Sequence, residues 1–150
     1  MNQPLPQVSE QEELEGSYTD PTGRVYRLTA AKEGTYSVTT DGICTRGNIG
    51  SKVTVESGGI CQGMPGSRLF IKDGGFGIAE ADCHMIVSFD GRGRGKCGSY
   101  ITAEGGSEVE ALDGCMVDVM AGATVNLRPG ALYRIVGPAG PRVINILPAE

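Results

Sequence analysis

The sequence predicts an all-β protein, a β-solenoid (β-helix) built of eight-residue strand–turn repeats, and three observations support this fold class. First, residues 28–139 divide into fourteen consecutive octads with no insertion or deletion. Second, a turn-forming residue holds the seventh position of every octad: Gly34, Gly42, Gly50, Gly58, Gly66, Gly74, Asp82, Asp90, Gly98, Gly106, Gly114, Gly122, Gly130 and Pro138. Third, most octads from residue 52 onward alternate apolar and polar residues, as in Lys52-Val53-Thr54-Val55, which is typical of a strand with one buried face.

Strands this short must stack, because four or five residues cannot bury an apolar face alone. A second period of sixteen groups the octads in pairs, since the fourth position is small in alternate octads: Ala31, Gly47, Gly63, Ala79, Gly95 and Ala111. Two architectures fit this pattern. One is a flattened single-chain solenoid with two octads per coil, in which a bulky-faced sheet packs on a small-faced one. The other is an intertwined trimeric β-prism in which each chain gives one octad per layer.

The repeat divides the chain into three segments. Residues 1–27 form an N-terminal arm and a first strand: residues 1–16 are acidic and contain prolines, so we expect them to be disordered alone or ordered only against a partner, whereas residues 24–28 alternate as a strand. Residues 28–139 form the octapeptide β-helix, which is more polar in 28–51. Residues 140–150 predict a last strand that serves as a C-terminal cap, because an open solenoid end exposes unpaired strand edges.

Composition excludes several classes of function. The net charge of −5 argues against a grip on nucleic-acid phosphates, and no apolar run approaches the roughly 18 residues of a membrane span. The N-terminal residues lack the basic region and apolar core of a secretory signal, so we expect a cytoplasmic protein or release by lysis. The five cysteines make an odd number, do not all occupy one octad position, and form no CxxC motif, so we expect neither a disulfide framework nor a metal site: Cys44, Cys61, Cys83, Cys97 and Cys115.

Two further patterns bear on chemistry. The stretch Gly93-Arg94-Gly95-Lys96-Cys97-Gly98 matches G-x-G-x-x-G, but a strand rather than a helix is expected after it, so the repeat explains its glycines better than a nucleotide site.

Some β-helix enzymes place acidic pairs on an outer face to cleave polysaccharides. The corresponding candidates here mostly lie at or beside expected turns, where Asp is favoured anyway, and this enzyme stays an alternative: Asp73, Glu80, Asp82 and Asp90. We predict no catalytic residue and no cofactor.

A basic cluster is the most specific candidate for partner binding. Arg92, Arg94 and Lys96 occupy alternate positions and therefore one face of a strand. They form either a solvated outer face or a patch for an anionic partner. One such partner is the acidic arm of another subunit, whose carboxylates would be Glu10, Glu12, Glu13 and Glu15.

The octads, with valine-type residues two apart and a regularly placed glycine, resemble the intertwined β-helical shafts of bacteriophage tail spikes and of the needle tips of contractile injection systems. This resemblance covers residues 28–139 and implies a homotrimeric, non-enzymatic virion component. Such a component is a short fibre, spike, decoration or adaptor protein, made in the host cytoplasm and anchored on other virion proteins through the N-terminal arm. A histidine-based metal tip has no counterpart, since the one histidine, His84, lies mid-chain. The alternative resemblance is to bactofilin-type cytoskeletal proteins, which are single-chain cytoplasmic β-solenoids that assemble end to end.

Overall fold

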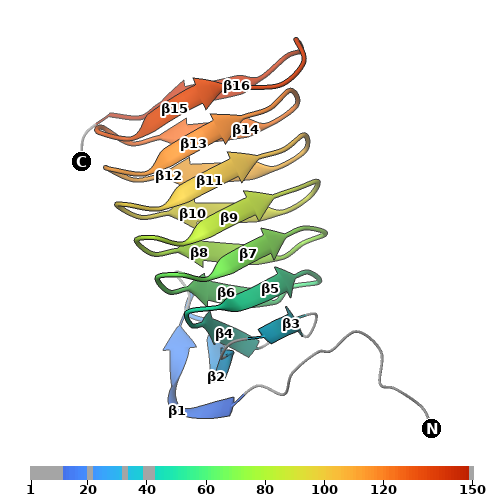
Figure 1. The fold of residues 1–150 in the computed structure, drawn as a ribbon, viewed down its shortest axis with the longest axis vertical. Coiled ribbons are helices and arrows are strands. Elements are labelled where there is room, and N and C mark those ends of the chain that lie inside the picture. Colours follow the sequence, from blue (N-terminus) through green and yellow to red (C-terminus); the bar gives the residue numbers. More distant parts are fainter. Residues whose placement is uncertain (1–11, 20–21, 32–33, 39–42, 149–150) are drawn as a thin grey trace, which may run out of the picture.

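The structure, a computed structural model, describes residues 12–19, 22–31, 34–38 and 43–148. These residues form strands and turns, with no helix among them that is long and apolar enough to cross a membrane. The strands wind into a stack of flattened coils (Figure 1). In chain order they are β1 (Glu12–Thr19), β2 (Val25–Ala31), β3 (Gly34–Val38), β4 (Ile43–Gly47), β5 (Ser51–Val55), β6 (Ile60–Gly63), β7 (Arg68–Ile71), β8 (Phe76–Ala79), β9 (His84–Val87), β10 (Arg92–Gly95), β11 (Tyr100–Ala103), β12 (Glu108–Ala111), β13 (Met116–Val119), β14 (Thr124–Leu127), β15 (Leu132–Ile135) and β16 (Val143–Ile146).

Two parallel sheets face each other across the core. The even-numbered strands form one sheet in the order β2-β4-β6-β8-β10-β12-β14-β16, with β1 added beside β2, and the odd-numbered strands from β3 to β15 form the other. Each strand pairs with the strand two places along the chain, so Val53 lies opposite Leu69 and Met85 opposite Ile101. One chain therefore supplies both octads of every coil. The predicted β-solenoid is confirmed in its single-chain form, and the chain does not form the intertwined trimeric prism.

The bulky-against-small packing expected from the sixteen-residue period is present. From β5 to β13 the inward apolar residues of the odd sheet are fully buried and, apart from Ala103, large, whereas the inward residues of the even sheet include Gly77, Gly93 and Gly95. A Cβ atom at Gly95 would overlap Cys115 Sγ and Ile101 Cδ1, so the interior leaves no room for a side chain there. The largest of the fully buried side chains are Leu69, Ile71, Met85 and Ile101.

Turn chemistry explains why the octads bend where they do. The seventh-position glycines from Gly50 to Gly130 have positive φ values, and Asp82 and Asp90 adopt the same left-handed conformation with φ of 61°. Turn amides also bond along the stack, as when the amide of Gly66 donates to the carbonyl of Asp82 at 3.0 Å. The turns therefore form ladders that continue the sheets.

The octad frame is interrupted near its start, contrary to the prediction of an unbroken repeat. Tyr36 on β3 pairs with Val53 on β5, one residue more than the sixteen-residue spacing that holds from β4 to β15. Gly34, predicted to be a turn residue, is instead the first residue of β3, and Gly42 lies outside the described residues. The polar octads of residues 28–51 lack the strong alternation that fixes strand register.

The two ends of the stack differ. The arm predicted for residues 1–16 is in part a strand, because β1 pairs antiparallel with β2, with an irregularity between Glu13 and Ser17. At the other end, β16 joins β14 in parallel, with Val143 opposite Thr124, three residues beyond the usual spacing. The segment 140–150, expected to form a cap, thus supplies the last strand of one sheet. The last coil lies at one end of the stack (Figure 1), and apolar side chains on it are exposed.

Candidate functional site

The last coil, formed by β15 and β16, is an apolar surface in the register of the core. Tyr133 pairs with Val117 and Ile135 with Val119, and both valines are fully buried. Tyr133 is nevertheless 46% exposed and Ile135 49%. Among the described residues, eight large hydrophobic side chains are exposed, and five of them lie on these two strands: Leu132, Tyr133, Ile135, Val143 and Ile146. The interior of the solenoid therefore opens to solvent at this end.

The loop that joins β15 to β16 is held by one arginine. The Arg142 guanidinium donates to the carbonyls of Val136 at 2.8 Å, Pro138 at 2.9 Å and Gly140 at 3.0 Å, and its Nε donates to Val119 at 3.1 Å. The carbonyl of Pro141 also accepts a hydrogen bond from the amide of Gly122 at 2.7 Å. The open coil is thus fixed to the coil below it, and its apolar surface has a defined shape.

The predicted basic cluster is placed on the outer face of the even sheet. Arg92 and Arg94 lie on β10, and Lys96 follows the strand. Arg94 pairs with Glu110 at 3.0 Å, and Lys96 pairs with Glu80 at 2.8 Å. Both bases thus contact acids of their own chain. The strand β1 contains Glu12, Glu13 and Glu15, whereas Glu10 lies outside the described residues.

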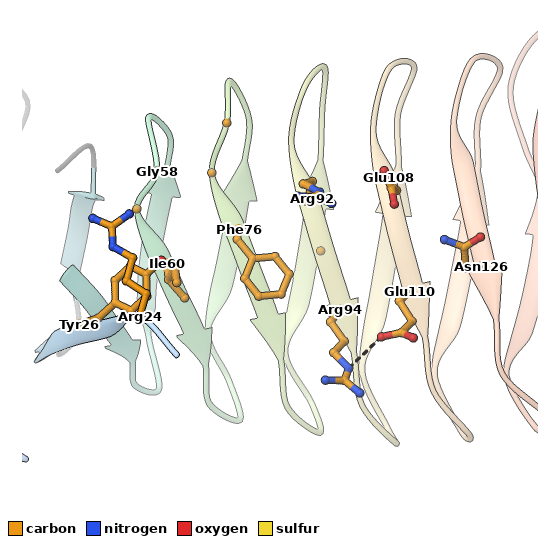
Figure 2. Close-up of a pocket in the computed structure, with 14 residues that line it drawn as sticks. Arg24, Tyr26, Gly58, Ile60, Phe76, Arg92, Arg94, Glu108, Glu110 and Asn126 are labelled. Carbon is orange, nitrogen blue, oxygen red and sulfur yellow. Dashed lines mark ion pairs between the residues drawn. The ribbon is translucent and has the colours of Figure 1, made fainter. Parts of the chain in front are cut away.

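A groove of about 520 Å³ runs along this outer face (Figure 2). Its apolar part contains Ile60 and Phe76, and Tyr26 stands at one end, where the Arg24 guanidinium lies 5.0 Å from its ring centroid. Arg92 and Glu108 follow on the next two strands. Sequence reasoning missed this groove, because turn glycines and alternate outward residues from coils sixteen residues apart combine to form it.

Acidic groups on the same face are held by hydrogen bonds. Burial alone would raise the pKa of the Glu80 carboxyl, but hydrogen bonds from Lys96 and from Gln62 Nε2, at 2.8 Å, outweigh burial and lower that pKa. The other candidate carboxylates occupy turns. Asp73, Asp82 and Asp90 all have positive φ values, which accounts for short polar residues at these positions.

The outer face of the odd sheet carries a polar ladder that the sequence did not suggest. Tyr100 donates a hydrogen bond to Asp118, and Arg134 donates to the same carboxylate at 2.9 Å and 3.0 Å. Burial opposes ionisation of Asp118, but the bonds from Arg134 and Tyr100 prevail and lower its pKa, while the bond to Asp118 raises the pKa of Tyr100. His84 packs edge-on against Tyr100 at 4.8 Å, and burial followed by the nearby Arg68 lowers its pKa.

The cysteines form no disulfide among the described residues. Four thiols are buried and Cys97 is exposed. Burial raises the pKa of the Cys44 and Cys83 thiols to about 11, which makes them poor nucleophiles. Nowhere in the described part of the chain do three His, Cys, Asp or Glu side chains gather as metal ligands.

Comparison with known proteins places the chain in no family. No family model matches it, and no curated protein matches it. Among solved structures, it matches the crystal structure of a TibC-catalysed hyper-glycosylated TibA fragment, residues 55–350, at 14% identity over 81% of this chain and 77% of that chain. The TM-score of 0.31 is too low for this similarity to support a function.

Proposed function

We propose that this protein is a non-enzymatic structural scaffold, a stiff β-solenoid whose copies join through the last coil. The observation that carries the proposal is that β15 and β16 pair in register with the strands before them, yet most of their inward apolar side chains are exposed where those of the preceding coil are buried. Contiguous exposed apolar surface marks an interaction site. The outer edges of these two strands also offer backbone groups that a further strand can pair with.

A second copy of the last coil is the occupant we propose. Two such ends can meet around a twofold axis, so that each covers the other's apolar surface in an isologous contact. The opposite end is a poorer partner, because β1 already pairs with β2 and has an irregular register between Glu13 and Ser17. Irregular, acidic edge strands disfavour further pairing. We therefore propose association tail to tail rather than head to tail.

This proposal follows the cytoplasmic scaffold alternative in preference to the virion component. The virion role rested on a shaft of intertwined chains, and a coil completed by one chain removes the reason for an obligatory trimer. The polysaccharide-cleaving alternative is also weaker, because Asp73, Asp82 and Asp90 have turn conformations and Glu80 is engaged by Lys96. A pair of copies in the cytoplasm is the assembly that we propose.

The test is the molar mass in solution, measured by light scattering after size exclusion over a range of protein concentrations. The wild-type chain is expected to form dimers, whereas Tyr133→Lys combined with Ile146→Lys is expected to be monomeric, because lysines would place charges in the apolar contact. Phe89→Lys is the matched control, since Phe89 is 70% exposed on a turn away from the last coil. A monomeric wild type, or lysine variants with unchanged mass, would refute the proposal.

A further inference from the structure

The outer face of the even sheet carries opposite charges on two neighbouring strands. In the parallel pairing of β10 with β12, Arg92 lies opposite Glu108 and Arg94 opposite Glu110. The strands on either side are uncharged at the corresponding positions. One row across six strands from β6 to β16 therefore runs apolar, apolar, basic, acidic, polar, apolar: Ile60, Phe76, Arg92, Glu108, Thr124 and Val143. When the row is read backwards, a basic residue takes the place of an acidic one and the other positions hold side chains without charge.

The charged pair of this row, Arg92 and Glu108, is free to contact another molecule. Glu110 is engaged within the chain, by Arg94 at 3.0 Å and by Arg128 at 3.3 Å. Arg92 and Glu108 are exposed side by side on the groove (Figure 2), and neither forms an ion pair with a described residue. Both charges therefore remain hydrated and available.

We propose that this face binds a second copy of the chain laterally, in antiparallel orientation, through the outer surface of the even sheet rather than through the exposed end of the stack. The twofold axis would run along the strand direction between β10 and β12. Arg92 of each copy then lies over Glu108 of the other, so the same ion pair forms twice, as an isologous contact requires. The same rotation sets Phe76 over the other copy's Thr124. Ile60 is only 4% exposed and packs with Tyr26, so the other copy's Val143 would meet the residues that cover Ile60 rather than Ile60 itself.

Charge selects this orientation over the parallel one. If two copies met with their stacks parallel, Arg92 would face Arg92 and Glu108 would face Glu108, and like charges at close range disfavour association. The outer face of the odd sheet lacks the pattern, because its corresponding row begins with the bases Lys52 and Arg68 and has no acid. Tyr26 and Arg24 lie at the far end of the groove, so they mark the limit of the contact.

The size of the face predicts a weak contact. Six strands at about 4.8 Å and four residues at about 3.3 Å give a face of roughly 29 Å by 13 Å on each copy. The total buried area would be somewhat below 1,000 Å², in the range of transient interfaces.

The experiment is sedimentation velocity at roughly 100 μM protein, a concentration suited to a weak interface, in the Tyr133→Lys and Ile146→Lys background. That background removes association through the last coil, so the lateral contact is measured alone. Arg92→Glu makes the row acidic on both strands, and Glu108→Arg makes it basic on both. Each variant alone is expected to dimerise about tenfold more weakly than the background, since two attractive pairs become repulsive. An equimolar mixture of the two is expected to recover or exceed the background affinity, and added salt to weaken it.

A matched mixture controls for simple attraction between oppositely charged proteins. Arg68→Glu and Glu56→Arg, in the same background, change charge by the same amounts on or beside the odd sheet. Because the control variants keep Arg92 and Glu108, the proposal predicts that each of them, alone or mixed, dimerises with the background affinity, whereas Arg92→Glu and Glu108→Arg are weakened alone and recover only when mixed. Equal weakening of the control variants, or no association of the background protein, would overturn it. The end-to-end contact would be unaffected by that result, because it is judged from the mass of the wild type and its Phe89→Lys control.

Discussion

Tyr133 lies directly opposite Val117 in the odd sheet, yet Val117 is fully buried and Tyr133 is 46% exposed. The two residues have the same register but differ in what covers them. Strand β13 lies between β11 and β15, whereas β15 has β13 on one side and no described strand on the other. In a solenoid, each coil completes the core of its neighbour. The apolar side chains of the last coil are therefore left without a covering coil, and tail-to-tail association would bury them.

Replacing Arg142 with Met tests whether the last coil is a prepared surface. The substitution removes four hydrogen bonds to the carbonyls of Val119, Val136, Pro138 and Gly140. We expect faster amide hydrogen exchange at Val143 and Leu147 and a several-fold weaker dimer, with little change at β9. Unchanged exchange in the last coil would show that Arg142 does not hold the loop.

Glycines on the inner face of the even sheet are predicted to be indispensable. At Gly95 a Cβ atom would overlap Cys115 Sγ and Ile101 Cδ1, so Gly95→Ala should destabilise the fold by about 1–3 kcal/mol through overpacking. Urea unfolding followed by circular dichroism measures this change. Thr124→Ala, on the outer face of the same sheet, is the control and should shift stability by less than about 0.5 kcal/mol. Equal effects of the two substitutions would contradict the small-faced sheet.

Turn positions should respond to alanine according to their backbone angle. Gly122 has a φ of 87°, so Gly122→Ala is expected to lower the free energy of unfolding by about 1 kcal/mol. Alanine is strained in the left-handed conformation, and the smaller entropy of its unfolded chain offsets part of that strain. Asp82 has a φ of 61° at the equivalent position, and Asp82→Gly should be neutral or slightly stabilising, because glycine accepts this conformation freely. Thermal unfolding of both variants checks the prediction, which fails if Gly122→Ala is as stable as the wild type.

Stability should fall between pH 7 and 5 because of His84. Burial, followed by Arg68, lowers the His84 pKa below its ordinary value of 6.5, so the unfolded chain takes up this proton before the folded chain does. Folding stability is therefore fully present above pH 6.5 and is lost as the pH falls through the lowered pKa. His84→Gln should flatten the profile in this window. The lowered pKa values of Glu80 and Asp118 act at more acidic pH, so a dependence that persists in His84→Gln would exclude His84 as its source.

The five thiols should react in two classes. Cys97 is exposed, whereas the other four cysteines are buried, with Cys61 fully so. A thiol reagent such as dithiobisnitrobenzoate is expected to modify one cysteine in the folded chain and all five in denaturant. Cys97→Ser should abolish the reaction of the folded chain. Rapid modification of several thiols without denaturant would mean that the core opens easily.

Much of the fold could be predicted because the repeat encodes it twice. Seventh-position glycines mark the turns, and the small fourth position of alternate octads predicts the small-faced sheet that contains Gly63 and Gly95. The choice between one chain and three could not be made from spacing, since a strand pairs equally well with its own chain or another. The strand β1 was missed because an acidic run without apolar period carries no strand signal, and its pairing with β2 is a tertiary effect.

The candidate sites were less accessible to sequence reasoning. Arg92 and Arg94 were identified, but their neighbours Glu108 and Glu110 become adjacent only when sixteen-residue coils stack. The network of Tyr100, Asp118 and Arg134 arises in the same way on the other face. The exposed last coil was expected to be a cap, because apolar residues between two prolines give no sign of whether anything covers them.

Small-angle X-ray scattering of the wild-type dimer tests the central claim most directly. The eight parallel strands of the even sheet, about 4.8 Å apart, make one solenoid roughly 40 Å tall. Tail-to-tail association predicts a dimer with a maximum dimension of roughly 80 Å, again from that coil height, which shortens to the monomer value in the Tyr133→Lys and Ile146→Lys variant. A dimer no longer than the monomer, or a trimer, would contradict association through the last coil.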